Sequence, residues 1–131
     1  MLNPSTADER RDDPTIARCR GIARRHGHGN LLVWNLFALR ATDPAELRRA
    51  SDPVGADNEA AIDLALSLCP RTVLAWGHHG THIGRAYLVR QQCRGRAGLA
   101  VLGLTASGEP RHPLYLRGDA ALREWPIAAD R

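Results

Sequence analysis

Short apolar runs alternate along this chain with segments whose apolar residues recur at helical spacing. The largely apolar runs are 31–34 (Leu-Leu-Val-Trp), 72–76 (Thr-Val-Leu-Ala-Trp) and 99–104 (Leu-Ala-Val-Leu-Gly-Leu). Runs of this length without polar alternation are typical of strands that are covered on both faces of a sheet. We therefore expect three buried strands, and Met1-Leu2 would be the stub of a fourth.

The segments around these runs predict helices. An acidic cap followed by proline, a common helix start, occurs at Asp13-Pro14 and again at Asp43-Pro44. The first of these helices is expected to end before Gly27, and the second covers 45–50.

Two more helices are predicted over 57–68 and from His78 to about Cys93, and a last short helix over 119–125. The residues expected to face inward are Ala61, Leu64, Ala65 and Leu68 in the first of these, and Ile83, Tyr87 and Leu88 in the second.

Strands that alternate with helices predict a parallel sheet covered by helices. The expected fold class is therefore α/β, as a three-layer α/β/α sandwich whose mostly parallel sheet has three or four strands. At 131 residues the chain fits a single domain, 1–131.

Composition adds little that is specific. Hydrophobic residues make up 44% and charged residues 24%, which is ordinary for a globular protein. No apolar run is long enough to cross a bilayer, and the first residues lack the apolar stretch of a signal peptide, so we expect no membrane association and a cytoplasmic location. The three cysteines are widely spaced, which fits a reduced compartment.

The formal charge is +4, and all 18 basic residues are arginine. Arginine presents a planar fork that suits phosphate and carboxylate, so the composition permits binding of a nucleotide or nucleic acid. GC-rich coding bias would produce the same arginine usage.

Polar residues follow the predicted strands at the places where this fold class binds ligands, which is beyond the carboxyl ends of the strands. These places are Asn3 to Thr6, Asn35 to Arg40, Gly77 to His79, and Thr105 to His112. This is the strongest purely physical indication of a site.

The first of these segments, Asn3-Pro4-Ser5-Thr6-Ala7-Asp8, is a polar turn made rigid by proline. Asn3 and Asp8 would orient a water molecule or contact a base edge, and Ser5 and Thr6 would contact phosphate. The competing interpretation is a chain end rich in turn-forming residues.

The other segments contribute three candidates. Asn35 carries a donor and an acceptor side by side, which matches the edge of a nucleobase, although asparagine caps turns as often. Arg40 would bind an anion or pair with a carboxylate. His112, held before Pro113, is placed for hydrogen bonding or proton transfer, or it is a solvent-facing loop residue.

Metal and cofactor sites have weak support. His78 and His82 would lie on one helical face near His79, but no Glu stands between them as a zinc protease motif requires, and no third ligand is evident. Cys19, His26 and His28 are loosely spaced. The chain has no nucleophile elbow, phosphate-binding loop or dinucleotide fingerprint. Their absence from the sequence disfavours serine hydrolases, nucleoside triphosphatases and Rossmann oxidoreductases, respectively. No metal or organic cofactor is expected.

Taken together, five motifs resemble the uncharacterised bacterial domain-of-unknown-function family 1643. The motifs are Met-Leu-Asn-Pro-Ser-Thr-Ala-Asp at 1–8, Asp-Asp-Pro-Thr-Ile at 12–16, Asn-Leu-Phe-Ala-Leu-Arg-Ala-Thr at 35–42, Ala-Trp-Gly at 75–77 and Arg-His-Pro-Leu-Tyr-Leu at 111–116. Members of that family carry a further strand before Leu-Asn-Pro-Ser, so the resemblance implies a sheet that lacks its N-terminal strand.

The order of these motifs is also distantly similar to the uracil-DNA glycosylase superfamily. That resemblance implies that Asn3 positions water, that Asn35 contacts the base and that His112 stabilises the departing base. It further implies contacts from the Pro4 and Gly77 turns and base stacking by Phe37. Ser5 stands where the superfamily often has glycine, and Leu114 stands where it has serine.

These observations lead to one expected function with two alternatives. The chain is expected to bind a nucleobase or nucleotide and to hydrolyse a base–sugar bond, with Arg40 and Arg111 holding phosphate. The first alternative is a non-catalytic module that binds nucleic acid or nucleotide, and the second is an inactive fragment. Whether the protein is an enzyme, and its oligomeric state, stay open.

Overall fold

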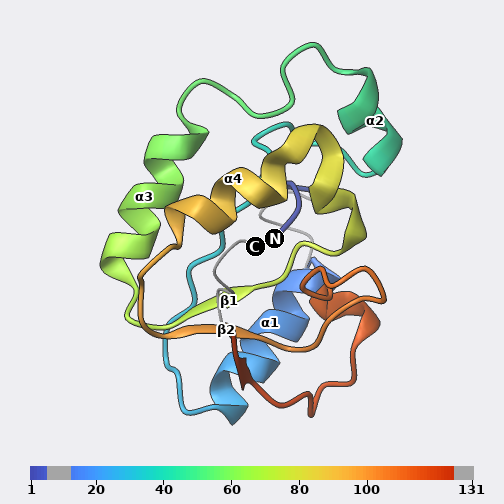
Figure 1. Cartoon of the computed structure of the whole chain (residues 1–131). Helices are drawn as coiled ribbons and strands as arrows, with labels where there is room; N and C mark the ends of the chain where they lie inside the picture. Colours follow the sequence, from blue (N-terminus) through green and yellow to red (C-terminus); the bar gives the residue numbers. More distant parts are fainter. Residues whose placement is uncertain (6–12, 126–131) are drawn as a thin grey trace.

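A small three-stranded sheet forms the centre of the computed structural model, which describes residues 1–5 and 13–125 (Figure 1). Its strands are β1 (Thr72–Leu74), β2 (Leu99–Val101) and β3 (Arg123–Glu124), in the order β1-β2-β3. β1 runs parallel to β2, and β3 runs antiparallel to β2. The sheet is therefore mixed, and only one of its two pairs is the parallel pair that the sequence predicts.

The helices are α1 (Pro14–Arg25), α2 (Pro44–Arg49), α3 (Asn58–Leu68) and α4 (Arg85–Gln92), with two 3₁₀ segments, η1 (His78–Gly84) and η2 (Pro113–Tyr115). Both Asp-Pro helix starts are confirmed. The Asp13 carboxylate accepts hydrogen bonds from the first backbone N–H groups of α1, and Asp43 forms a capping box with Glu46 at the start of α2.

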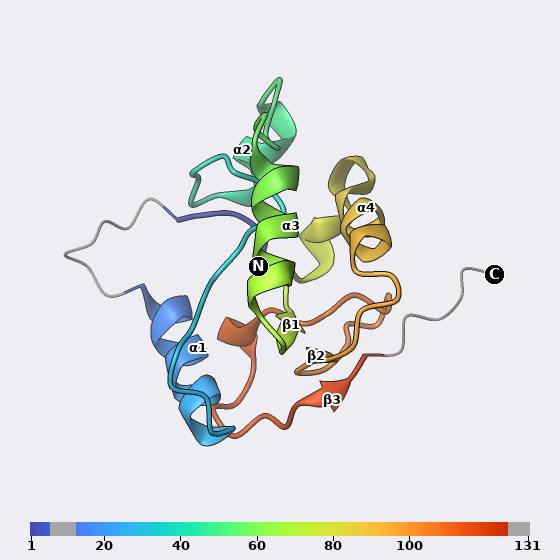
Figure 2. The same ribbon diagram turned by 90° about the vertical axis from the view of Figure 1, so that its left-hand side faces the viewer.

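The helices are distributed unevenly around the sheet. α3 and α4 lie together on one side of β1 and β2, whereas α1 lies apart from them and packs against η2 (Figures 1 and 2). The mixed α/β class is confirmed, but a complete three-layer sandwich is not. No helix in the described part of the chain is long and apolar enough to span a membrane.

The strand predicted at 31–34 is wrong. The segment forms no strand, and the side chains of Leu31 and Leu32 are 42% and 54% exposed. A cavity of about 230 Å³ is lined both by residues 30–36 and by residues 71–76, so the two segments do not pair. An apolar run becomes a strand only where a neighbouring backbone satisfies its hydrogen bonds, and β1 does not serve as that neighbour here.

The start of the chain nevertheless lies beside the next residues. The N–H of Leu36 donates to the Met1 carbonyl at 3.1 Å, and the N–H of Phe37 donates to the Leu2 carbonyl at 2.9 Å. Met1-Leu2 is not assigned as a strand, but these bonds connect it to the segment that follows the apolar run.

The predicted inward face of the helix over 57–68 is right at Ala65 and wrong at its other positions. In α3 the buried residues are Ile62, Ala65 and Leu66, whereas Leu64 and Leu68 are 60% and 63% exposed. Apolar residues occupy most of this helix, so helical spacing alone allowed a face shifted by one position.

The segment from His78 to Cys93 is two helical pieces rather than one. Ile83 and Gly84 both have positive φ, +46° and +68°, and this break resets the phase before α4 begins. Arg85, Ala86 and Val89 are buried as a result, and the predicted inward residues of this segment are exposed: Ile83, Tyr87 and Leu88.

The last predicted helix, over 119–125, is wrong, because this segment contains a strand at the edge of the sheet. Residues 119–125 contain β3, and the N–H of Trp125 donates to the Leu99 carbonyl at 3.0 Å. The expected third strand, 99–104, is shorter than its apolar run, because β2 ends at Val101. Pairing with β2 outweighs the local helix preference of this short segment.

Because Gly80 has no side chain, the core residues Trp76 and Leu36 pack directly against its backbone. A Cβ at this position would overlap the Trp76 ring and come within 2.9 Å of Leu36 Cδ1. Trp76 and Leu36 are each 2% exposed and belong to the core cluster. Neither neighbour can move without disturbing close packing.

We expect Gly80→Ala to lower the free energy of unfolding by about 1–3 kcal/mol, the usual cost of overpacking. Gly21→Ala is the matched control, because a Cβ at Gly21 in α1 meets nothing within 4 Å. That change should stabilise the protein by about 1 kcal/mol or less through helix propensity. Urea unfolding of both variants measures the difference, and equal stabilities would contradict this account of the core.

Candidate functional site

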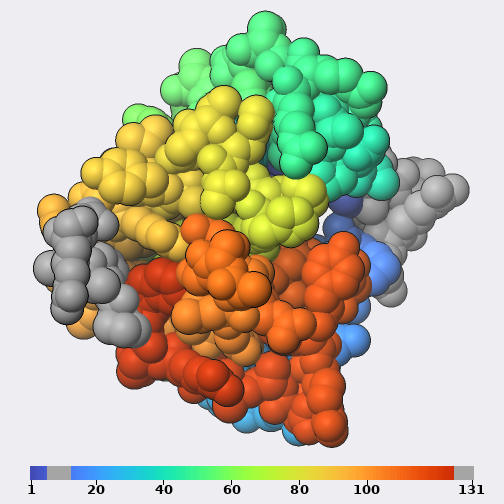
Figure 3. Space-filling view, turned by 45° about the vertical axis from the view of Figure 1, so that its right-hand side comes forward, coloured from blue at the N-terminus to red at the C-terminus, as the bar shows by residue number. Residues whose placement is uncertain are grey.

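A cavity of about 820 Å³ opens where five stretches of chain that are distant in sequence meet. The stretches are the chain start, the first turns of α1, the loop between Asn35 and Pro44, the Gly77 turn, and the segment from Thr105 to Tyr115. Figure 3 shows the face of the molecule on which η1, the α2 region and the 105–115 segment border one another. Eight of the sequence-predicted site residues line this cavity: Asn3, Pro4, Ser5, Asn35, Arg40, Gly77, Arg111 and His112.

The Gly77 turn brings two of these stretches into contact. Gly77 has φ +76°, a conformation that favours glycine, and its N–H donates to the Pro110 carbonyl at 2.7 Å. A Cβ on Gly77 would lie 3.5 Å from the Cβ of His112. The end of the β1 segment therefore fixes the position of His112.

Asn3 uses its amide nitrogen to hold the chain start. Nδ2 donates to the carbonyls of Ala41 at 2.8 Å, Pro4 at 3.0 Å and Leu39 at 3.4 Å. The Ala41 N–H in turn donates to the Pro4 carbonyl at 3.0 Å. Among the described residues none donates to Oδ1 of Asn3, so that oxygen is the part of the side chain available to a water molecule or ligand.

Ser5 and Asp13 connect the chain start to α1. The Ser5 hydroxyl donates to Asp13 Oδ2 at 2.7 Å, while Asp13 Oδ1 accepts from the N–H of Thr15 at 2.7 Å. Burial by itself raises the pKa of Asp13, but the hydrogen bonds from Ser5, Thr15 and Ile16 outweigh it and leave the pKa below its ordinary value. Asp13 is therefore ionised at neutral pH, and it is the only carboxylate among the described residues that line the cavity.

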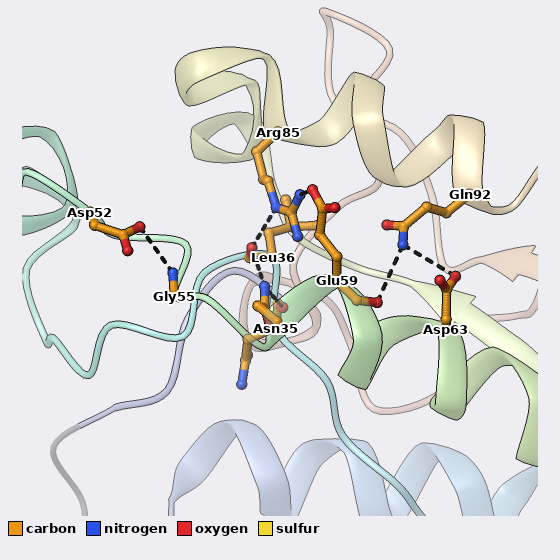
Figure 4. A network of polar contacts seen from close by, with 9 residues as sticks. Asn35, Leu36, Asp52, Gly55, Glu59, Asp63, Arg85 and Gln92 are labelled. Atoms are coloured by element: carbon orange, nitrogen blue, oxygen red, sulfur yellow. Dashed lines mark hydrogen bonds and ion pairs between the residues drawn. The ribbon is translucent and has the colours of Figure 1, made fainter.

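Asn35 is held through its backbone and not through its side chain. Asn58 Nδ2 donates to the carbonyls of Asn35 at 3.2 Å and Leu36 at 2.7 Å, and Arg85 Nε donates to the Leu36 carbonyl at 2.8 Å. Figure 4 shows Arg85 and Glu59 beside the Asn35–Leu36 backbone. No described residue forms a hydrogen bond with the side-chain amide of Asn35, and the residue lines this cavity as well as the cavity of about 230 Å³.

The hydrogen bonds of His112 define its tautomer. Its Nδ1 accepts from the Leu114 N–H at 3.3 Å, so the neutral ring carries its proton on Nε2. Burial lowers the pKa of His112 from 6.5, and Asp13 opposes this shift. At neutral pH the half-buried ring is therefore an uncharged donor on the cavity wall.

The cavity wall is basic. Arg20, Arg40 and Arg111 line it, and among the described residues none of them forms a salt bridge. Among the described lining residues, Asp13 is the one carboxylate that opposes their charges. This arrangement attracts an anion, because arginine forks bind phosphate and carboxylate oxygens through charge-assisted hydrogen bonds.

One described residue of the predicted site, Phe37, does not line this cavity. Phe37 is 0% exposed in the core, so the expectation that it stacks on a base is wrong. Its position follows from the apolar packing around residues 36–37, which sequence spacing did not reveal. Tyr115 offers an aromatic ring instead: it lines the cavity, is 75% exposed and has its ring centroid 5.7 Å from that of His112. Thr6 and Asp8 lie outside the described residues.

Sequence reasoning missed several contributors to the wall. Arg20 was not predicted as a site residue, and His78 and His79 were placed at a predicted strand end but given no role there. The described residues contain no group of three or more His, Cys, Asp or Glu that could hold a metal ion. The position of His78 and His79 directly after Gly77, at a predicted strand end, already indicated this part of the wall.

The fold and this site together define a mixed α/β protein with a basic cavity that two asparagines, Asn3 and Asn35, help to line. The chain matches the family model described as protein of unknown function (DUF1643) over residues 1–114, and it belongs to that family. No curated protein and no solved structure matches the chain.

The coupling between Asp13 and His112 can be tested directly. Asp13→Asn should lower the pKa of His112 further, because it removes the negative charge that favours the imidazolium, while asparagine still caps α1. An NMR titration of the histidine ring signals measures this, and His112→Gln identifies the signal. No response of the His112 pKa to Asp13→Asn would show that the two groups do not interact, and a wild-type pKa at or above 6.5 would contradict the dominant effect of burial.

Proposed function

We propose that the cavity binds a nucleobase or nucleotide, with the base against Asn35, His112 and Tyr115. The observation that carries this proposal is the Asn35 side chain, which lines the cavity while its backbone is held by Asn58 and Arg85. A rigidly placed amide with both polar groups available is suited to a base edge, where donor and acceptor lie side by side.

The other wall residues supply the remaining parts of such a site. The exposed ring of Tyr115 suits stacking on a base, which is worth about 1–3 kcal/mol per base. The Nε2–H of neutral His112 donates to a carbonyl oxygen of the base. Arg20, Arg40 and Arg111 attract the negatively charged part of a nucleotide.

Hydrolysis of a base–sugar bond is a second candidate function, favoured by the tautomer of His112. A departing base accumulates negative charge, and a fixed donor at that point lowers the barrier. Asn3 Oδ1 would accept a hydrogen bond from the attacking water, the role that the distant resemblance to uracil-DNA glycosylases assigns to Asn3. The amide nitrogen of Asn3 holds the 39–41 loop, so its role would include structure.

We expect Asn35→Ala to weaken binding of nucleoside 5′-monophosphates by about 5- to 150-fold, the value of one bidentate base contact. Isothermal titration calorimetry with the nucleoside 5′-monophosphates of the four common bases measures the loss of affinity. Asn30→Ala is the matched control, because Asn30 is exposed and does not line this cavity. Equal affinity in wild type and Asn35→Ala, or no nucleotide binding by the wild-type chain, would refute the proposed site.

A parallel assay separates hydrolysis from binding. Incubation with nucleosides, single-stranded DNA and mismatched DNA, followed by detection of free base and abasic product, is carried out on wild type and His112→Gln. Product formation that His112→Gln reduces by about 100-fold or more would identify a hydrolase with His112 at its centre. Tight binding without product would identify a non-catalytic binding module.

A further inference from the structure

A cluster of basic side chains lies where the cavity meets α2. His78 and His79 both line the cavity, and their ring centroids are 3.8 Å apart. Arg48 of α2 approaches from the other side, with Nη2 3.4 Å from Nδ1 of His79. Because arginine is always a donor, Nδ1 accepts in this contact, and neutral His79 carries its proton on Nε2.

This cluster has little compensating charge. The charged groups near His79 are His78 on its own turn and Arg48 and Asp43 of the α2 region. Asp43 is engaged by the N-terminus of α2, where its Oδ1 accepts from the Ala45 N–H at 2.8 Å. Among the described residues Arg48 has no salt bridge. Burial, then His78 and Arg48, lower the pKa of His79 below 6.5, with Asp43 opposing.

Arg48 brings a positive charge that no described carboxylate pairs with, and its guanidinium donates to His79 Nδ1. A tetrahedral dianion would accept from the Arg48 fork and from the histidine N–H groups, and it would balance the charge of Arg48. The surface position of Arg48 and His78 leaves them free to reorient around such a ligand, while half-buried His79 gives the cluster a fixed member.

We propose that His78, His79 and Arg48 form a subsite for a phosphate monoester at the edge of the cavity. That the ester is part of a nucleotide rests on the proposed function; the subsite itself does not. The ligand of the whole cavity would then be a nucleoside monophosphate, with its base at Asn35 and its phosphate at His79. The shared chemistry also covers free phosphate, which the experiment distinguishes.

The subsite has a pH signature whose sign follows from the surroundings of His79. In the free protein its pKa lies below 6.5, so the ring is neutral at pH 7. A bound dianion favours the protonated ring and raises the pKa, so binding takes up a proton. Affinity therefore increases as pH falls from 7.5 towards the pKa of the free protein, by at most about tenfold per pH unit for one proton.

Sulfate is the probe for this signature, because it stays a dianion over the whole range whereas phosphate takes up a proton itself. Sulfate affinity of the full chain is measured by calorimetry between pH 7.5 and 5.5 at constant ionic strength. We expect the wild type to bind several-fold more tightly at pH 5.5 than at pH 7.5. His79→Gln should bind more weakly and lose the pH dependence, whereas exposed His28, which does not line this cavity, provides the control His28→Gln.

Arg48→Gln gives a second, independent readout. It removes a positive neighbour, so the pKa of His79 should rise in the NMR titration of the unliganded protein while sulfate affinity falls. In the wild type, adding sulfate should raise the pKa of His79, a measurement that does not depend on any variant folding. Sulfate affinity that is independent of pH and unchanged in both variants would overturn the subsite.

The last comparison separates this subsite from the proposed function and identifies the source of the phosphate. Sulfate should compete with a nucleoside monophosphate, which should bind more tightly than either inorganic phosphate or the corresponding nucleoside. Inorganic phosphate binding as tightly as the nucleotide would overturn the assignment of a nucleotide ligand. If sulfate binds through His79 but the nucleoside does not bind at all, the base site fails and the subsite stands. If the nucleoside binds through Asn35 and sulfate does not bind, the subsite fails and the base site stands.

Discussion

The buried guanidinium of Arg85 fixes the part of the chain on which the cavity depends. Arg85 is 1% exposed, donates to the Leu36 carbonyl at 2.8 Å and pairs with Glu59 at 3.1 Å. The segment 31–34 forms no strand, so the sheet does not hold residues 35–37 in place. Their position comes from Arg85 and Asn58 on the carbonyl side and from Met1 and Leu2 on the amide side. A buried cation is costly to desolvate, which indicates that this connection is specific.

A second polar network supports the opposite wall of the cavity. Buried Glu109 accepts from the Trp76 indole at 2.7 Å and pairs with Arg90 at 2.9 Å. The Arg90 guanidinium lies 5.9 Å from the centroid of the Trp76 ring and 5.3 Å from that of Trp125. This network joins α4, the end of the β1 segment and the turn before Pro110, and thereby holds the Gly77 turn beside His112. The sheet is small, so charged and aromatic contacts carry much of the positioning that longer strands would provide.

The sequence predicted features whose determinants are local. Both Asp-Pro starts and the glycine turn after β1 were found, because a cap or a turn is specified by adjacent residues. Most candidate site residues line one cavity for a similar reason, since polar residues after apolar runs converge wherever the runs converge. The strand predicted at 31–34 and the predicted phase of α4 are wrong because pairing partners and the Ile83 kink depend on tertiary structure. The complete burial of Phe37 has the same origin.

Asn3 and Asn35 show why the same sequence pattern produced opposite arrangements. Each asparagine follows apolar residues and lines the same cavity. The side chain of Asn3 donates to three backbone carbonyls, so most of its hydrogen-bonding capacity stabilises the protein itself. The backbone of Asn35 is held by side chains from α3 and α4, and no described residue forms a hydrogen bond with its side-chain amide. A held backbone lowers the conformational entropy that this residue would lose if a ligand bound to its amide. The distinction lies in which residues surround each asparagine, and it is visible only in the folded chain.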